Sequence, residues 1–136
     1  MSLTSIQHLL VLTDDIDGTR DFYRDALGLE EGPRPPSLPF PGYWLYAQGV
    51  PCVHVADREI YNAHASTLGL AASEATHGSG VVDHVAFNAG DYDEITARLE
   101  RHGVDAVKNT VPEIDMRQLF IDDPNGVRIE INVLPS

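Results

Sequence analysis

The chain repeats its candidate metal ligands at a fixed distance along the sequence. His8 and His84 are 76 positions apart, and so are His54 and Glu130. An internal repeat constrains the architecture before any single residue is interpreted, because each repeat is one structural unit. The offset predicts two similar modules, each with one such residue near its first strand and another on its last strand.

Helix caps and turns follow nearly the same spacing, although the two halves share little sequence identity. Asp14–Asp15 and Asp91 each precede a stretch with helical periodicity, and Gly28 and Gly103 close those stretches at an offset of 75. A turn precedes each of the strands that hold His54 and Glu130. These turns are Gln48–Gly49 and Asn125–Gly126. Six histidines and 21 acidic residues allow coincidences, so these caps and turns are what support the repeat.

Each module is predicted to run strand, helix, strand, strand, strand, which gives an α+β fold class. In the first module we expect strands at residues 6–12, 29–31, 43–47 and 52–56, and a helix at 16–27. In the second module we expect strands at residues 81–88, 105–109, 116–121 and 127–133, and a helix at 92–102. Asp91 and Glu94 can form a capping box for the second helix. Five prolines within residues 32–41 exclude regular structure there.

The 136 residues suit one domain made of two modules and a connector. Module 1 is expected at about 5–57, the connector at about 58–80, and module 2 at about 81–134. The connector has no counterpart in the second module, and its apolar residues suggest a short helix. A simple link between modules is one interpretation, and a segment that folds over a site is the other, because the length allows both.

Charge and cysteine content narrow the partners and the compartment. Nine basic and 21 acidic residues give a net charge of −12, which argues against nucleic acid and anionic membranes and favours a bound cation. The single cysteine, Cys52, excludes an intrachain disulfide framework and fits a reducing compartment such as the cytoplasm. No apolar run approaches the roughly 18 residues of a membrane span. The first residues also lack the pattern of a signal peptide.

Three segments resemble the vicinal oxygen chelate superfamily, which includes glyoxalase I, bleomycin and fosfomycin resistance proteins, methylmalonyl-CoA epimerase and extradiol dioxygenases. They are RDFYRDALGL at residues 20–29, VDHVAF at residues 82–87, and DDPNGVRIE at residues 122–130. The resemblance covers nearly the whole chain, and its motifs are specific to the superfamily without separating its members. It implies two βαβββ modules whose eight strands curl into a cup, with the helices outside.

The resemblance also implies a metal site. The superfamily's ligands match His8, His84 and Glu130 here. Two histidines and one carboxylate bind a divalent metal on one face and leave positions open, which in the superfamily take two adjacent oxygens of a substrate. The metal then acts as a Lewis acid. Fe(II) is the favoured ion, with Zn, Ni, Mn and Co as alternatives.

Strand periodicity supports this placement independently of the family. Along the last strand, apolar side chains alternate with polar ones, the polar set being Arg128, Glu130 and Asn132. In the first module, Cys52, His54 and Ala56 share one face of their strand, opposite Val53 and Val55. The alternation therefore places His54 and Glu130 away from the face that packs against the helix.

His54 separates the activities of the superfamily. In glyoxalase I the matching position holds a glutamate ligand, whereas in extradiol dioxygenases it holds a histidine that stays off the metal and transfers protons. We therefore expect His54 to act as a catalytic acid or base, with a fourth ligand or a passive pocket residue as open alternatives. Two departures weaken the dioxygenase assignment, because Phe120 and Val111 stand where those enzymes usually carry a tyrosine and a further histidine.

The resemblance favours an extradiol dioxygenase-like enzyme that acts on a small aromatic or vicinal-oxygen substrate. The alternatives are a glyoxalase-type lyase or isomerase, and a drug-binding or fosfomycin-modifying resistance protein. Trp44 and Phe120 are also 76 residues apart, and with Tyr46 they are predicted either to form an apolar pocket for a flat substrate or to pack in the core.

The remaining histidines and the cysteine receive no catalytic role. His64, His77 and His102 are expected in solvated loops or on helix surfaces, and Cys52 is expected to fill a small buried space. By analogy with small members of the superfamily, we expect a homodimer. The eight strands can form one cup within a chain or exchange modules between two chains, and only the second arrangement would draw metal ligands from both subunits.

Overall fold

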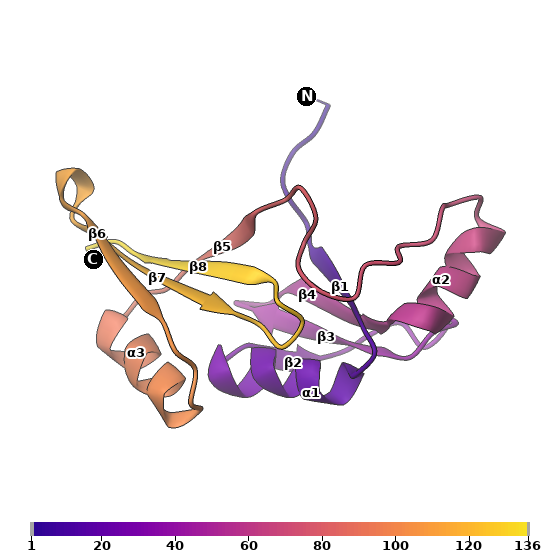
Figure 1. Cartoon of the computed structure of the whole chain (residues 1–136), viewed down its shortest axis with the longest axis horizontal. Coiled ribbons are helices and arrows are strands. Elements are labelled where there is room, and N and C mark those ends of the chain that lie inside the picture. Colours follow the sequence, from indigo (N-terminus) through magenta and orange to yellow (C-terminus); the bar gives the residue numbers. More distant parts are fainter. Residues whose placement is uncertain (1, 136) are drawn as a thin grey trace. The chain divides into compact units, whose positions relative to one another are not determined.

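The computed structural model describes residues 2–135, which divide into two compact units. The first unit holds the described residues up to Arg24 and Leu29–Thr76, and the second holds Asp25–Gly28 and the described residues from His77 onward. Each unit contains one four-stranded sheet (Figure 1). The connector expected at residues 58–80 is therefore divided between the units.

The two sheets have the same topology. The first contains β1 (Leu9–Thr13), β2 (Glu30–Gly32), β3 (Gly42–Ala47) and β4 (Val50–Asp57), in the spatial order β1-β4-β3-β2. The second contains β5 (His84–Asn88), β6 (Val107–Val111), β7 (Met116–Asp122) and β8 (Arg128–Val133), in the order β5-β8-β7-β6. In each sheet the first pair of neighbours is parallel and the others are antiparallel. The α+β fold of two βαβββ modules is thereby confirmed.

Strand register also repeats. His54 pairs with Leu10 on β1 and with Trp44 on β3. At an offset of 76, Glu130 pairs with Ala86 on β5 and with Phe120 on β7. The first sheet reaches this register through an irregularity in β3 between Leu45 and Ala47. We call the face that carries Leu10, Trp44 and His54 the first ligand face, and the face that carries Ala86, Phe120 and Glu130 the second ligand face.

The helices begin at the predicted caps. The carboxylate of Asp15 accepts the N–H three residues ahead at 2.9 Å, and α1 (Ile16–Asp21) follows and continues as a π-helical turn. The carboxylate of Asp91 accepts the N–H of Glu94 at 3.0 Å at the start of α3 (Tyr92–Arg101), which is half of the expected capping box. No helix in the described part of the chain is long and apolar enough to cross a membrane.

The core of each unit lies on the sheet face opposite the ligand face. Its most deeply buried large side chains are Tyr23, Leu45 and Val53 in the first unit, and Leu99, Leu119 and Ile129 in the second. Leu45 and Val53 come from the strand faces that alternate away from Trp44 and His54. The apolar face of each sheet therefore packs in the core, as the alternation predicted. The candidate site residues His54 and Glu130 lie on the ligand faces.

Two strands begin three residues later than the sequence suggested, which is the largest such difference. β1 starts at Leu9 where residue 6 was expected, and β5 starts at His84 where residue 81 was expected. The apolar segments ahead of them find no neighbouring strand, and Ile6 and Val81 are 95% and 105% exposed. His8 therefore stands one residue before its strand.

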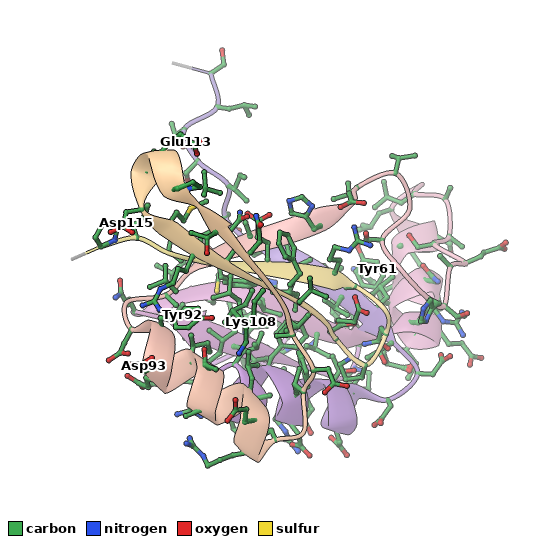
Figure 2. The ribbon with its side chains drawn as sticks, turned by 60° about the vertical axis from the view of Figure 1, so that its left-hand side comes forward. Tyr61, Tyr92, Asp93, Lys108, Glu113 and Asp115 are labelled. Atoms are coloured by element: carbon green, nitrogen blue, oxygen red, sulfur yellow. The ribbon has the colours of Figure 1, made fainter. Side chains whose placement is uncertain are left out.

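The connector begins with a helix, α2 (Arg58–Thr67), which packs against β1 and β4. Tyr61 lies on this helix (Figure 2), and its ring meets the ring of Phe40 edge to face at 5.1 Å. His64 lies on α2, which is one of the two kinds of position expected for it, and it is half-buried there, with its ring 5.6 Å from the ring of the same phenylalanine. The proline-rich segment 33–41 has no regular structure, as expected, and α2 fixes its Phe40 in place.

Candidate functional site

Three aromatic rings are stacked on the first ligand face. The ring of His54 lies between the rings of His8 and Trp44, with centroid distances of 3.8 Å and 4.0 Å. The interplanar angles are 13° and 7°, so the three rings are nearly parallel. Trp44 and His54 meet because they are register partners on neighbouring strands, and His8 reaches the stack from just ahead of β1.

The imidazole of His54 has one free ring nitrogen. Its Nε2 is buried and has no hydrogen-bond partner among the described residues. Burial, and secondly the neighbouring His8, lower the pKa of His54 from 6.5 to about 4, while a hydrogen bond to the backbone of Pro51 opposes this. A buried polar atom without a partner typically costs about 1–3 kcal/mol. The neutral ring therefore has a nitrogen that a ligand or a proton can satisfy.

The parallel stack limits how the two histidines can bind a metal. An imidazole nitrogen donates its lone pair in the plane of its ring. Because the two ring planes are nearly parallel and the ring centroids are 3.8 Å apart, an ion shared by His8 and His54 could not lie in the planes of both rings. In this arrangement one of the two rings can ligate an ion and the other stands off it.

A cavity of about 310 Å³ adjoins the stack within the first unit. Its walls come from the first ligand face, the proline-rich segment and α2. Its lining residues include His8, Arg34, Phe40, Trp44, His54 and Tyr61. One residue of the connector helix, Tyr61, therefore lines this cavity.

His84 and Glu130 approach each other on the second ligand face. His84 Nε2 lies 3.4 Å from Glu130 Oε1. Histidine and carboxylate ligands lie about 2.0–2.2 Å from an ion such as Zn²⁺, so atoms at this separation can bind the same ion. The other ring nitrogen, Nδ1, is 2.8 Å from a carboxylate oxygen of Asp83, which Arg128 contacts at 3.1 Å. The bond from His84, followed by the charge of Arg128, lowers the pKa of Asp83.

A row of side-chain hydrogen bonds crosses the second ligand face from β6 to β8. The amide of Asn109 donates to Gln118 at 2.8 Å, and the amide of Gln118 donates to Asn132 at 3.1 Å. Asn132 then donates to Glu130 Oε2 at 2.8 Å. One carboxylate oxygen is thereby held by an amide, and the other faces His84. We call this row the amide chain.

The sequence did not reveal the amide chain. Strand alternation placed Asn132 on the same face as Glu130, but it assigned no role to Gln118. The signal that was available is their pairing in register across the final hairpin, together with Asn109 on the next strand. Three amide side chains at adjacent register positions can form such a row, because each amide both donates and accepts.

The predicted site residues fall into two groups, one in each unit. His8, His54 and Trp44 meet in the first unit, whereas His84 and Glu130 meet in the second, where Phe120 is the register partner of Glu130. Within each unit taken alone, no three histidine, cysteine or acidic side chains of the described residues gather in a metal-binding group.

Tyr46 and Cys52 do not line the cavity beside the stack. The hydroxyl of Tyr46 donates to the carbonyl of Pro33. Cys52 is partly exposed, so it is not the fully buried filler that was expected.

Comparison with known proteins identifies the family. Residues 5–131 match the Glyoxalase/Bleomycin resistance protein/Dioxygenase superfamily. A protein from Arabidopsis thaliana named Glyoxylase I 4 is 30% identical over 133 residues, which cover 96% of this chain and 71% of that protein. The chain belongs to this superfamily, and the resemblance inferred from its motifs is confirmed.

Solved structures share the fold. A lactoylglutathione lyase from Agrobacterium tumefaciens matches with a TM-score of 0.71 at 22% identity, covering 98% of this chain and 96% of that one. A genomically encoded fosfomycin resistance protein from Listeria monocytogenes matches with a TM-score of 0.69 at 14% identity, covering 98% and 95%. At these identities the likeness extends to the fold and not to the activity.

Proposed function

We propose that this protein is a metal-dependent enzyme of the vicinal oxygen chelate type, with His8, His84 and Glu130 as metal ligands. The observation that carries the proposal is the 3.4 Å approach of His84 Nε2 to Glu130 Oε1, each backed by a hydrogen bond to its other polar atom. Such partners orient ligands and set the histidine tautomer. When bound, the metal supplies Lewis acidity that lowers the pKa of substrate oxygens.

His54 is proposed as the group that moves a proton. The stack with His8 disfavours both rings on one ion, and His8 is the one that matches the family's ligand position. His54 then stands next to the metal site with Nε2 unpartnered, which suits a proton acceptor at a nearby substrate. Trp44 holds the ring in place from the other side.

The first candidate reaction is a lyase or isomerase reaction of the glyoxalase type. Its support is the relative named Glyoxylase I 4, which is 30% identical across nearly the whole chain. In such a reaction His54 would accept a proton from a carbon next to the metal-held oxygens and return it to the neighbouring carbon. Histidine in place of the family's glutamate ligand would make this a variant of the glyoxalase site.

The second candidate is extradiol ring cleavage, which one specific observation favours. A histidine that stands off the metal is the arrangement implied for those enzymes, and the His8–His54 stack fits it. Phe120 stands where they usually carry a tyrosine. Under this candidate, Phe120→Tyr should hold or raise ring-cleavage activity on a catechol.

The test begins with metal analysis of protein purified without chelator. Protein loaded with Zn²⁺ or Ni²⁺ is then assayed for isomerisation of a thiol adduct of a 2-oxoaldehyde, and protein loaded with Fe(II) is assayed for oxygen uptake on a catechol panel. Turnover of the thiol adduct supports the first candidate, and oxygen uptake supports the second. Tight binding of an antibiotic with no turnover in either assay would contradict both and indicate a drug-binding protein.

We also propose a homodimer. Ile6 and Val82 again differ by 76 positions, and they are 95% and 62% exposed in the segments ahead of β1 and β5. Exposed apolar residues at equivalent places suit a symmetric contact between chains. Light scattering of the metal-loaded protein at micromolar concentration should give twice the mass of the chain, and a monomer there would contradict the proposal.

A further inference from the structure

Arg34 brings a positive charge without an acidic partner to the wall of the cavity. Its Nη2 donates to the carbonyl oxygen of Phe40, and its guanidinium lies 5.2 Å from the centre of that residue's ring. No acidic side chain of residues 2–135 lies within ion-pair distance of it. A guanidinium carries five N–H donors, so several of them are free of any charged partner.

The other arginines of the first unit, which are Arg20, Arg24 and Arg58, are engaged by acids. Arg20 lies 2.8 Å from a carboxylate oxygen of Asp21, and Arg58 lies 2.8 Å from one of Asp14. Burial lowers the pKa of Arg34, which reflects the cost of keeping its charge away from water. A partly buried cation without an acidic partner favours an anionic ligand beside it, because the charge of the ligand offsets the cost of burial.

Apart from Gln7, His8 and His54, the rest of the cavity lining is apolar or aromatic. Trp44 forms its floor on the first ligand face, and Phe40 and Tyr61 form a wall held together by their edge-to-face contact at 5.1 Å. The volume of about 310 Å³ is at the lower end of the roughly 300–1,000 Å³ of small-molecule pockets. These rings have few rotatable bonds, so they shape a slot for a small flat group.

We infer that this cavity binds a small aromatic carboxylate, with its ring against Trp44 and Phe40 and its carboxylate on Arg34. The planar guanidinium can hold a carboxylate through two parallel hydrogen bonds. The inference rests on the proposed function only in taking this molecule as the substrate, because every residue that binds it belongs to the first unit. Arg34 is then the residue that selects for a negative charge.

Trp44 makes the inference directly measurable, because it is the only tryptophan of the chain. The full-length protein is titrated with benzoate and with benzamide, its neutral counterpart of similar shape, and tryptophan emission is recorded. Both the metal-loaded and the chelator-treated protein are used. We expect benzoate to bind at least about tenfold more tightly than benzamide in both forms, because a charge-assisted bond typically contributes about 1.5–3 kcal/mol.

Two matched variants test the role of the charge. Arg34→Gln should remove the preference for benzoate, whereas Arg101→Gln removes an equal charge from an exposed position on α3 and should keep it. If Arg34→Gln fails to fold by circular dichroism, Arg34→Lys takes its place. This variant keeps the charge without the planar pair of donors, and it should retain part of the preference.

Several results would overturn the inference. These are equal affinity for benzoate and benzamide, an undiminished preference in the Arg34 variants, or a preference that disappears when the metal is removed. The last result would mean that the carboxylate binds the metal and not Arg34. Failure of the metal-site proposal is distinguishable, because Glu130→Ala would then keep its metal while the benzoate preference stayed unchanged.

Discussion

The two ligand faces share a topology and a register, yet they hold their key residues by opposite kinds of interaction. On the first face, His54 is held by flat contacts with His8 and Trp44, and its Nε2 has no hydrogen bond. On the second face, Glu130 is held by the amide chain and approached by His84. The repeat therefore fixes where a functional side chain stands, but not how it is oriented.

The difference has a physical consequence for each face. Ring stacking contributes about 0.5–1.5 kcal/mol per pair and fixes the plane of a ring, while the Nε2 of His54 stays available. Hydrogen bonds to a charged group contribute about 1.5–3 kcal/mol and fix the position of individual oxygens. The first face is thus suited to a group that exchanges a proton, and the second to a group that must present one atom to an ion.

The largest expected effect is loss of metal when the second face loses its carboxylate. Glu130→Ala removes the only anionic ligand of the proposed set, so stoichiometric metal measured by atomic spectroscopy should fall to background. Glu100→Ala removes the same charge from an exposed position on α3 and should leave metal content unchanged. Full metal content in Glu130→Ala would exclude this residue as a ligand.

The next effect separates the two faces by function. His54→Ala should keep the metal but lower turnover by roughly 10²–10⁴-fold, the usual contribution of a positioned proton-transfer group. Cys52→Ala changes a partly exposed neighbour on β4 and serves as the control. Loss of metal in His54→Ala would make His54 a fourth ligand and remove the contrast between the faces, and unchanged turnover would make it a passive residue.

A smaller effect is expected from cutting the amide chain. Asn132→Leu leaves Glu130 in place but removes the donor to its Oε2, so metal affinity should fall about 10–100-fold, as is typical when a ligand loses its supporting partner. Asn109→Leu cuts the far end of the chain, three bonds from the carboxylate, and should change the affinity much less. Equal losses in metal titrations of the two variants would show that orientation of Glu130 is not the cause.

The smallest expected effect is on the pH dependence of stability, and it tests whether the ring of His54 is buried in its neutral form. The pKa of His54 is about 4 in the folded chain and about 6.5 when unfolded, so the unfolded chain binds more protons between these values. The contribution of the neutral ring to stability is complete above pH 6.5 and is lost as the pH falls toward 4. In metal-free protein, the melting temperature of the wild type relative to His54→Gln should drop by a few degrees from pH 7 to pH 5. A difference that stays constant over this range would argue against a buried neutral ring.

The sequence predicted the topology well because helix caps and strand alternation are local signals, and because the repeat shows the same order of elements twice. It could not predict that Trp44 stacks on His54. The turn at Gln48–Gly49 sets the pairing Ala47↔Val50, and a regular hairpin would continue it to place Trp44 opposite Val53, on the core side. The irregularity between Leu45 and Ala47 shifts the register by one and brings Trp44 to the first ligand face.

The cavity and the amide chain could not be predicted from the sequence either, for a different reason. Arg34 and Phe40 lie in a segment without periodicity, so nothing local indicates that Tyr61 of α2 will close against them. The amide chain depends on the rotamers of Gln118 and Asn132, which a strand pattern does not specify. Strand patterns predicted which face these two amides share, whereas the contacts among them required the structure.

The parallel pairing of β1 with β4, and of β5 with β8, has a consequence for how each unit folds. Leu10 pairs with His54 and Ala86 pairs with Glu130, and in both cases the chain between the partners must be brought into a closed loop before the pair can form. Such non-local pairings are slower than hairpins. The parallel strand pairs β1–β4 and β5–β8, which carry His54 and Glu130, should therefore form last in their units. A chain able to bind its metal is then also one that has finished folding.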